Sequence, residues 1–216
     1  MKGFLLPSGL RSVVCVGAHA DDIEIGAGGT LAALAATRPL VRFLFIVLTA
    51  DDLRSAEAVA SAEALLGDRV EVRFGEFDDS YLPYRDPAGV KDYLKTASPL
   101  DPDLVLGPNQ HDAHQDHRFV SNLLGEVYRD QVILGYEVVK YDGDLGRPNV
   151  YFPLTAEAAR SKADHIRTYF GSQAAKPWFN EETFTSIMRL RGIESRAPEG
   201  YAEAFYSPKV VVGLAK

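Results

Sequence analysis

Cysteine is almost absent from this sequence of 216 residues, in which Cys15 is the only one. A single cysteine cannot form an intrachain disulfide, and it excludes a metal cluster built from several thiolates. Long apolar runs are missing too, since the longest, 43–48, is far shorter than the roughly 18 residues of a membrane span. Pro7 and Arg11 interrupt the N-terminal apolar patch, which argues against a secretory signal. We therefore expect a cytoplasmic protein with no membrane partner.

Basic stretches are also lacking. The chain has 30 acidic and 23 basic residues, which gives a formal net charge of -7. Proteins that bind nucleic acids usually carry a basic stripe, so a nucleic-acid partner is not expected. Hydrophobic residues make up 46% of the chain and charged residues 25%, the ordinary composition of a soluble globular protein with a sizeable core.

Apolar segments alternate with helical patterns over the first two thirds of the chain. The sequence predicts strands at 11–18, 40–49, 69–74, 102–108 and 131–139, and helices at 28–37, 53–67, 90–95 and 117–128. This alternation predicts an α/β fold, with a mostly parallel sheet and helices on both of its faces.

The C-terminal third has a different pattern. Helices are predicted at 155–173, with Thr155 as the N-cap, and at 180–192, opening at Asn180. A last strand is predicted at 203–213. We expect one domain over 1–216, with an α/β core at 1–135 and a small C-terminal cap region at 136–216.

Charged residues follow the first predicted strand in the stretch "VGAHADDIEIGAGGTL". His19, Asp21, Asp22 and Glu24 would lie at the carboxyl end of that strand, where ligands bind in open parallel sheets. Three carboxylates there would repel the pyrophosphate of a dinucleotide. The glycines that follow are expected to let the backbone approach a ligand. The alternative, that the two aspartates cap a helix and the histidine packs in a turn, stays open.

A second cluster, "NQHDAHQDHRFV", follows the strand predicted at 102–108. His114 and His117 are three residues apart, so they share one side of a helical turn. Asp112 and Asp116 are close enough to orient imidazoles, as carboxylates do around bound metals. A solvated polar loop is the alternative.

Both clusters together indicate a metal site. Imidazole and carboxylate suit zinc, and three protein ligands leave a position for water. The favoured ligands are His19, His117 and one of Asp21 and Asp22, with the other aspartate as general base and His114 as general acid. Spacing alone leaves the choice of aspartate open, and Fe²⁺ accepts the same ligand types.

The sequence resembles the LmbE-like, or PIG-L, family of N-acetylglucosaminyl deacetylases. "AHADDIEIGAGG" and "HQDH" match the family motifs A-H-P-D-D-x-E-x-G-x-G-G and H-x-D-H, with Ala20 in place of proline. The resemblance continues through "LTADD", "RSAEA", "YEV", "SQ", "RLRG" and "YAEAF", and it implies a Rossmann-like α/β fold. It also implies that zinc is held by His19, Asp22 and His117, that Asp21 is the base, and that His114 is the acid or oxyanion partner.

The same resemblance implies a zinc-dependent hydrolase that removes the acetyl group from an N-acetylated amino sugar or glycoside and releases acetate. It places Arg54 near the substrate, and Gln173 and Glu203 are further candidates from the C-terminal region. Six aromatic side chains are candidates for stacking on a sugar: Tyr81, Tyr84, Tyr136, Tyr141, Trp178 and Phe179.

Two rival functions and the assembly state stay open. The rivals are a non-haem Fe(II) oxygenase with a two-His-one-carboxylate site and a non-catalytic sugar-binding module. A homo-oligomer is compatible with the sequence.

Overall fold

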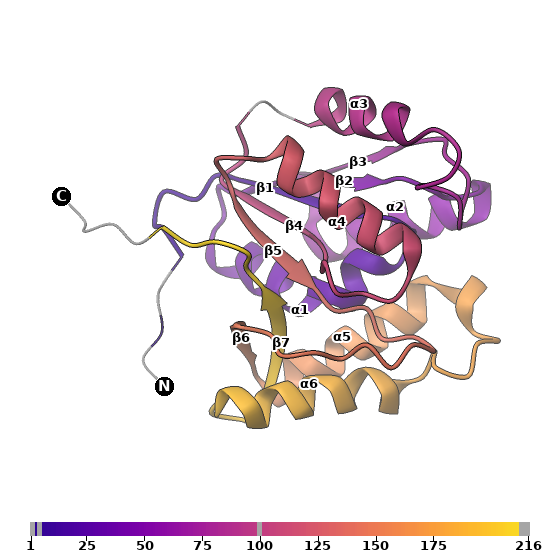
Figure 1. The fold of residues 1–216 in the computed structure, drawn as a ribbon. Coiled ribbons are helices and arrows are strands. Elements are labelled where there is room, and N and C mark those ends of the chain that lie inside the picture. The colour runs from indigo at the N-terminus through magenta and orange to yellow at the C-terminus, as the bar shows by residue number, and fades with distance from the viewer. Residues whose placement is uncertain (1–2, 4–5, 99–100, 212–216) are drawn as a thin grey trace.

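A seven-stranded sheet forms the centre of the computed structural model, which describes residues 3, 6–98 and 101–211 (Figure 1). The strand order is β3-β2-β1-β4-β5-β7-β6. The first five strands are parallel, whereas β7 runs antiparallel to both β5 and β6. The strands are β1 (Ser12–Gly17), β2 (Arg42–Val47), β3 (Val70–Phe74), β4 (Leu104–Pro108), β5 (Val132–Tyr136), β6 (Val150–Leu154) and β7 (Tyr201–Tyr206).

Helices cover both faces of this sheet. They are α1 (Asp22–Thr37), α2 (Asp52–Leu66), α3 (Pro87–Ala97), α4 (Gln115–Val127), α5 (Ala156–Tyr169) and α6 (Glu181–Ser195), with short 3-10 turns at Gly67–Arg69 and Gly171–Gln173. The α/β class with a mostly parallel sheet is therefore confirmed. Among the described residues, no helix combines the length and apolar character that crossing a membrane requires.

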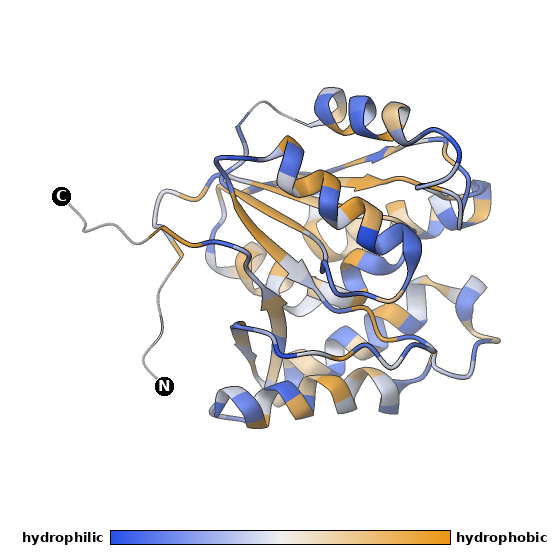
Figure 2. Cartoon of the chain, in the orientation of Figure 1, coloured by the Kyte–Doolittle hydropathy of each residue, from blue (hydrophilic) through white to orange (hydrophobic). Residues whose placement is uncertain are grey.

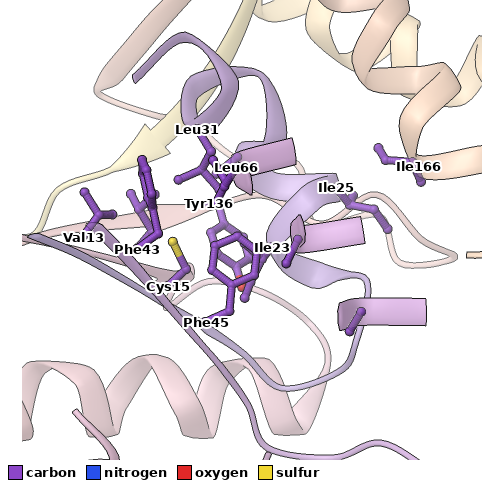
Figure 3. Close-up of a cluster of buried hydrophobic side chains, with 14 of the residues drawn as sticks. Val13, Cys15, Ile23, Ile25, Leu31, Phe43, Phe45, Leu66, Tyr136 and Ile166 are labelled. Carbon is purple, nitrogen blue, oxygen red and sulfur yellow. The ribbon is translucent and has the colours of Figure 1, made fainter. Parts of the chain in front are cut away.

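Strand β1 shows why the sheet is buried on both faces. Val13 and Cys15 belong to the core cluster under α1, α2 and α5, and Val14 and Val16 to the cluster under α3 and α4. Figure 3 shows the first cluster, in which Cys15 lies close to Tyr136, and Figure 2 shows the apolar residues concentrated along the strands. A strand covered on both faces reads as a continuous apolar run, as this one does in the sequence.

Helix α1 begins at Asp22, six residues before the predicted helix at 28–37. The sequence analysis missed its first turns because they are rich in glycine, which disfavours helices. These glycines allow close packing inside the protein. A Cβ at Gly26 would lie 2.3 Å from the Tyr136 ring, and one at Gly29 would lie 2.8 Å from Leu154. The expectation that these glycines make room for a ligand is thus wrong for Gly26 and Gly29, which let α1 approach β5 and β6.

Two further elements differ from the sequence prediction. Strand β6 was not predicted, since Pro153 interrupts a short apolar run; it lies at the edge of the sheet, where proline is tolerated. Helix α6 opens at Asn180 as predicted, with the Asn180 side chain accepting a hydrogen bond from Thr183 N. It continues past Gly192 and ends at Arg196, which has left-handed backbone angles.

The C-terminal third adds β7 and β6 to the same sheet, while α5 packs against α1 and α2. The division of the domain at residue 135 stays a prediction. What positions the site is the pairing of β1 with β4, because it places the segments after Gly17 and after Pro108 side by side at one edge of the sheet.

Candidate metal centre

Three side chains meet where β1 and β4 end. His19 follows β1, Asp22 opens α1, and His117 lies in the first turn of α4. His19 Nδ1 is 3.1 Å from His117 Nε2 and 3.5 Å from Asp22 Oδ2, and His117 Nε2 is 3.2 Å from Asp22 Oδ2. Two ligands of one tetrahedral zinc, each about 2.0–2.1 Å from the ion, are separated by about 3.4 Å. The donor set and its spacing therefore fit zinc.

Charge supports the same conclusion. Burial alone would raise the pKa of Asp22, but the neighbouring His117 and His19 hold it well below its usual value. Burial would likewise lower the pKa of His117, yet Asp22 and Asp112 raise it to about 9. Among the described residues, Asp22 forms no ion pair with a lysine or arginine. A divalent cation would bind between this buried carboxylate and the two imidazoles.

Asp21 has a different environment from its neighbour. It is the N-cap residue of α1, but its side chain makes no capping hydrogen bond. Instead Asp21 Oδ1 lies 3.2 Å from Arg54 Nη2. Burial, followed by the negative charge of Asp22, raises the pKa of Asp21, and Arg54 limits that rise. The helix-capping alternative therefore does not explain the Asp21 side chain.

His19, Asp22 and His117 form a group that we call the metal triangle. Carboxylates lie behind both of its histidines. His117 Nδ1 is 2.9 Å from Asp112 Oδ2. On the other histidine, His19 Nε2 is 3.2 Å from Asp79 Oδ1 and 3.4 Å from Asp116 Oδ2. An imidazole that binds metal usually presents its other nitrogen to such an acceptor, which fixes the ring orientation.

These partners are themselves held by other groups. Asp116 is buried and accepts hydrogen bonds from the backbone N–H groups of Ser80 and Leu82. Asp112 Oδ1 lies 2.9 Å from Lys140 Nζ. Asp112 and Asp116 thus lie where the sequence placed them, each beside one histidine of the triangle.

His114 borders the same site. Its ring centroid lies 4.9 Å from the centroids of both His19 and His117. As the N-cap residue of α4, it accepts a hydrogen bond from Asp116 N through Nδ1, so the neutral ring carries its proton on Nε2. Burial and the two nearby histidines lower the pKa of His114, which favours this neutral form. One nitrogen from each of the three histidines also forms a group within 4.8 Å, an alternative ligand set.

Glu24 is completely buried beneath this site. Its Oε1 accepts a hydrogen bond from Ser61 Oγ at 2.6 Å, and Ser61 Oγ is 2.9 Å from His165 Nε2. Burial raises the pKa of Glu24 to about 8. Glu24 therefore keeps a proton at neutral pH and connects α1, α2 and α5.

The proposed substrate contacts divide into two groups. Arg54 reaches the site, where it bridges Asp21 and Asp79. Glu203 lies deeper: its carboxylate accepts hydrogen bonds from Gly29 N and Thr30 N and pairs with Lys162. Those contacts give Glu203 a structural role.

Gln173 and some of the aromatic candidates are also held within the protein. Gln173 is buried and donates a hydrogen bond to Ser172 Oγ. Tyr136 and Phe179 are buried core residues, so neither presents a free face to a sugar. By contrast, Tyr81 and Tyr141 are exposed. Tyr81 follows Ser80, whose N–H donates to Asp116, and Tyr141 follows Lys140, which pairs with Asp112.

Two residues of the site were missed by the sequence analysis. Asp79 follows β3 in "FDDSYL", and Lys140 follows β5 in "YEVVK". Neither stretch contains histidine, the residue by which the other two segments are recognised. A signal existed all the same, since both residues follow parallel strands and so lie at the edge of the sheet that carries the site.

This α/β fold, with imidazole and carboxylate donors at the carboxyl ends of its strands, defines a protein with a candidate divalent-metal centre. The chain belongs to the PIG-L family, because the sequence model of that family, described as GlcNAc-PI de-N-acetylase, matches residues 14–128, more than half of the chain. The match contains both histidine clusters. The chain is thus a member of a family of deacetylases, as the sequence motifs predicted.

Solved structures share the fold. The N,N'-diacetylchitobiose deacetylase of Pyrococcus horikoshii is 23% identical, with a TM-score of 0.71 over 92% of this chain and 84% of that one. A deacetylase of teicoplanin biosynthesis is 17% identical, with a TM-score of 0.71 over 91% and 97%. GalB, the 4-carboxy-2-hydroxymuconate hydratase of Pseudomonas putida, is 21% identical, with a TM-score of 0.72 over 95% and 100%. At these identities the likeness establishes the fold, and one of the three acts as a hydratase.

Proposed function

We propose that this protein is a zinc-dependent hydrolase that removes the acetyl group from an N-acetylated amino sugar or glycoside and releases acetate. The observation that carries this proposal is that two adjacent aspartates have different contacts. Asp22 faces the two imidazoles, whereas Asp21 lies beside them with a raised pKa and no capping role. Metal-dependent amide hydrolysis needs one carboxylate to bind the ion and another to accept a proton.

His19, Asp22 and His117 would hold the zinc. Bound zinc would lower the pKa of a water molecule to about 7 and polarise the acetamide carbonyl. Asp21 accepts the proton of the attacking water and would return it to the amide nitrogen as the C–N bond breaks, and Arg54 keeps the Asp21 carboxylate oriented. Because His114 Nδ1 accepts a hydrogen bond from Asp116 N, its Nε2–H is free of that contact and would donate to the amide oxygen as negative charge builds there.

The substrate class follows from family membership and from the exposed edge of the site. Tyr81 and Tyr141 are exposed aromatic side chains on which a sugar ring could stack, although Arg85 already lies over one face of the Tyr81 ring. The chitobiose deacetylase and the teicoplanin deacetylase are named for acting on sugar-containing molecules, which supports the same class here. A cytoplasmic location and a homo-oligomer stay predictions.

Acetate release from a panel of N-acetyl sugars, glycosides and sugar nucleotides tests the proposal. We expect the zinc-loaded protein to release acetate and the Asp21→Asn variant to bind zinc equally but turn over about 10²–10⁴-fold more slowly. Sugar binding without release would favour the non-catalytic module, and oxygen consumption with Fe²⁺ would favour the oxygenase. Hydration of a muconate in place of deacetylation would assign the chain the chemistry of GalB.

A further inference from the structure

Lys140 lies in the segment between β5 and β6, directly behind the metal centre. Its side chain is 10% exposed, and its Nζ is 2.9 Å from Asp112 Oδ1 and 2.9 Å from Asp144 Oδ2. Asp144 Oδ2 also accepts a hydrogen bond from Ala113 N. The ammonium group is therefore fixed between two carboxylates, and its segment is tied at two points to the loop that precedes α4.

Asp112 connects this cation to the metal triangle. Its Oδ1 forms an ion pair with Lys140 and accepts a hydrogen bond from His114 N, and its Oδ2 lies 2.9 Å from His117 Nδ1. Both oxygens are thus occupied, and the carboxylate plane has a single orientation. A continuous line of contacts runs from the ammonium through the carboxylate to the imidazole whose Nε2 faces the metal position.

The other histidine of the triangle has two carboxylates behind it, and only the half-exposed Asp79 pairs with a cation, Arg54. Asp116, behind His19, is held by two backbone N–H groups, and among the described residues it pairs with no lysine or arginine. Asp112 has only one backbone N–H, from His114. Lys140 therefore supplies a cation as the second partner of Asp112 Oδ1.

We propose that Lys140 is a positioning residue that tightens zinc binding by fixing the Asp112 carboxylate against His117. This inference rests on the proposed metal centre. Without the ammonium group, Asp112 would be a buried carboxylate with no cation, held at Oδ1 by His114 N alone, and its orientation against His117 would be less well fixed. Groups that orient metal ligands typically contribute 10–100-fold to metal affinity.

Zinc affinity of the metal-free protein, measured by chelator competition with Zn²⁺ alone, tests the proposal. We expect Lys140→Met to raise the zinc Kd about tenfold and Lys140→Arg to restore much of the affinity. Lys162→Met is the matched control, since Lys162 also forms a buried ion pair, with Glu203, but touches no group of the metal centre. Its zinc Kd should stay within twofold of the wild type. Lys140→Gln, which keeps a hydrogen-bond donor, replaces Lys140→Met if that variant does not fold.

A second measurement asks whether the effect passes through Asp112. In an Asp112→Ala background, Lys140→Met should change the zinc Kd by less than twofold, because the connecting carboxylate is gone. An undiminished effect in that background would overturn the proposal, as would a Lys140→Met variant whose zinc Kd changes less than threefold. These titrations need no substrate, so they separate failure of this inference from failure of the deacetylase proposal, which acetate release decides.

Discussion

Buried charges occur in two regions of this molecule, at the ends of β1 and β4 and among the C-terminal elements. In the C-terminal region each charge has a direct partner. Arg191 forms two hydrogen bonds with Glu137, at 2.8 and 2.6 Å, and Lys162 pairs with Glu203 at 2.5 Å. The Glu203 carboxylate also accepts hydrogen bonds from two backbone N–H groups of α1. These charges are satisfied within the protein.

The region at the ends of β1 and β4 is different, because its acids and imidazoles converge without enough cations. Arg54 pairs with Asp21 and Lys140 with Asp112, whereas Asp22 meets only two histidines among the described residues. An isolated buried charge is costly, so such an arrangement persists when something else neutralises it. The difference separates buried carboxylates that pair with lysine or arginine from one that contacts imidazoles, the side chains that also bind divalent metals.

His117→Ala should produce the largest effect, since it removes one of three donors from the region that lacks a cation. We expect the zinc Kd to rise by about 10³-fold or more and acetate release to be lost, while the circular dichroism spectrum stays that of the folded wild type. Metal content after dialysis checks the first point. Stoichiometric zinc in the variant would mean that His114 takes the place of His117 beside His19 and Asp22, or that the ion binds elsewhere.

The metal triangle could be predicted from the sequence because its residues lie in two short stretches that follow apolar strands. His19, Asp22 and His117 carry the chemistry in their own side chains, and the parallel sheet brings the strand ends together. Asp79 and Lys140 could not be recognised in this way, because a lone aspartate or lysine after a strand is usually solvated. Their roles depend on which side chain each one meets.

The limits of prediction were similar for the fold. Local patterns located most elements, but the start of α1 and the whole of β6 depended on packing between distant segments. Position 26 of α1 needs glycine because the Tyr136 ring occupies the space that a side chain there would take. Glu203 was expected near the substrate because it lies in the C-terminal cap region, yet its position against Gly29 and Lys162 is set by the antiparallel strand β7.

Glu203→Gln tests the opposite side of the comparison, where the charges are already satisfied. The substitution leaves Lys162 as a buried cation without its carboxylate, and breaking such a pair costs about 3 kcal/mol of unfolding free energy. Urea unfolding should reveal this loss, while the zinc Kd stays within twofold of the wild type. A large fall in zinc affinity with little loss of stability would show that Glu203 serves the site after all.

Glu24→Gln should have the smallest effect near pH 5, and it sharpens the comparison because Glu24 lies between the two regions. Burial raises the pKa of Glu24 from about 4.5 to about 8, so the fold favours the protonated form. The unfolded chain releases that proton near pH 4.5, and the wild type therefore loses stability as pH rises from about 4.5 to about 8. The glutamine variant has no such proton and should match the wild type near pH 5 but exceed it at pH 9, by roughly 4 kcal/mol. Urea unfolding of both metal-free proteins at the two pH values measures this difference, and a gap that is independent of pH would mean that Glu24 is already ionised in the folded protein.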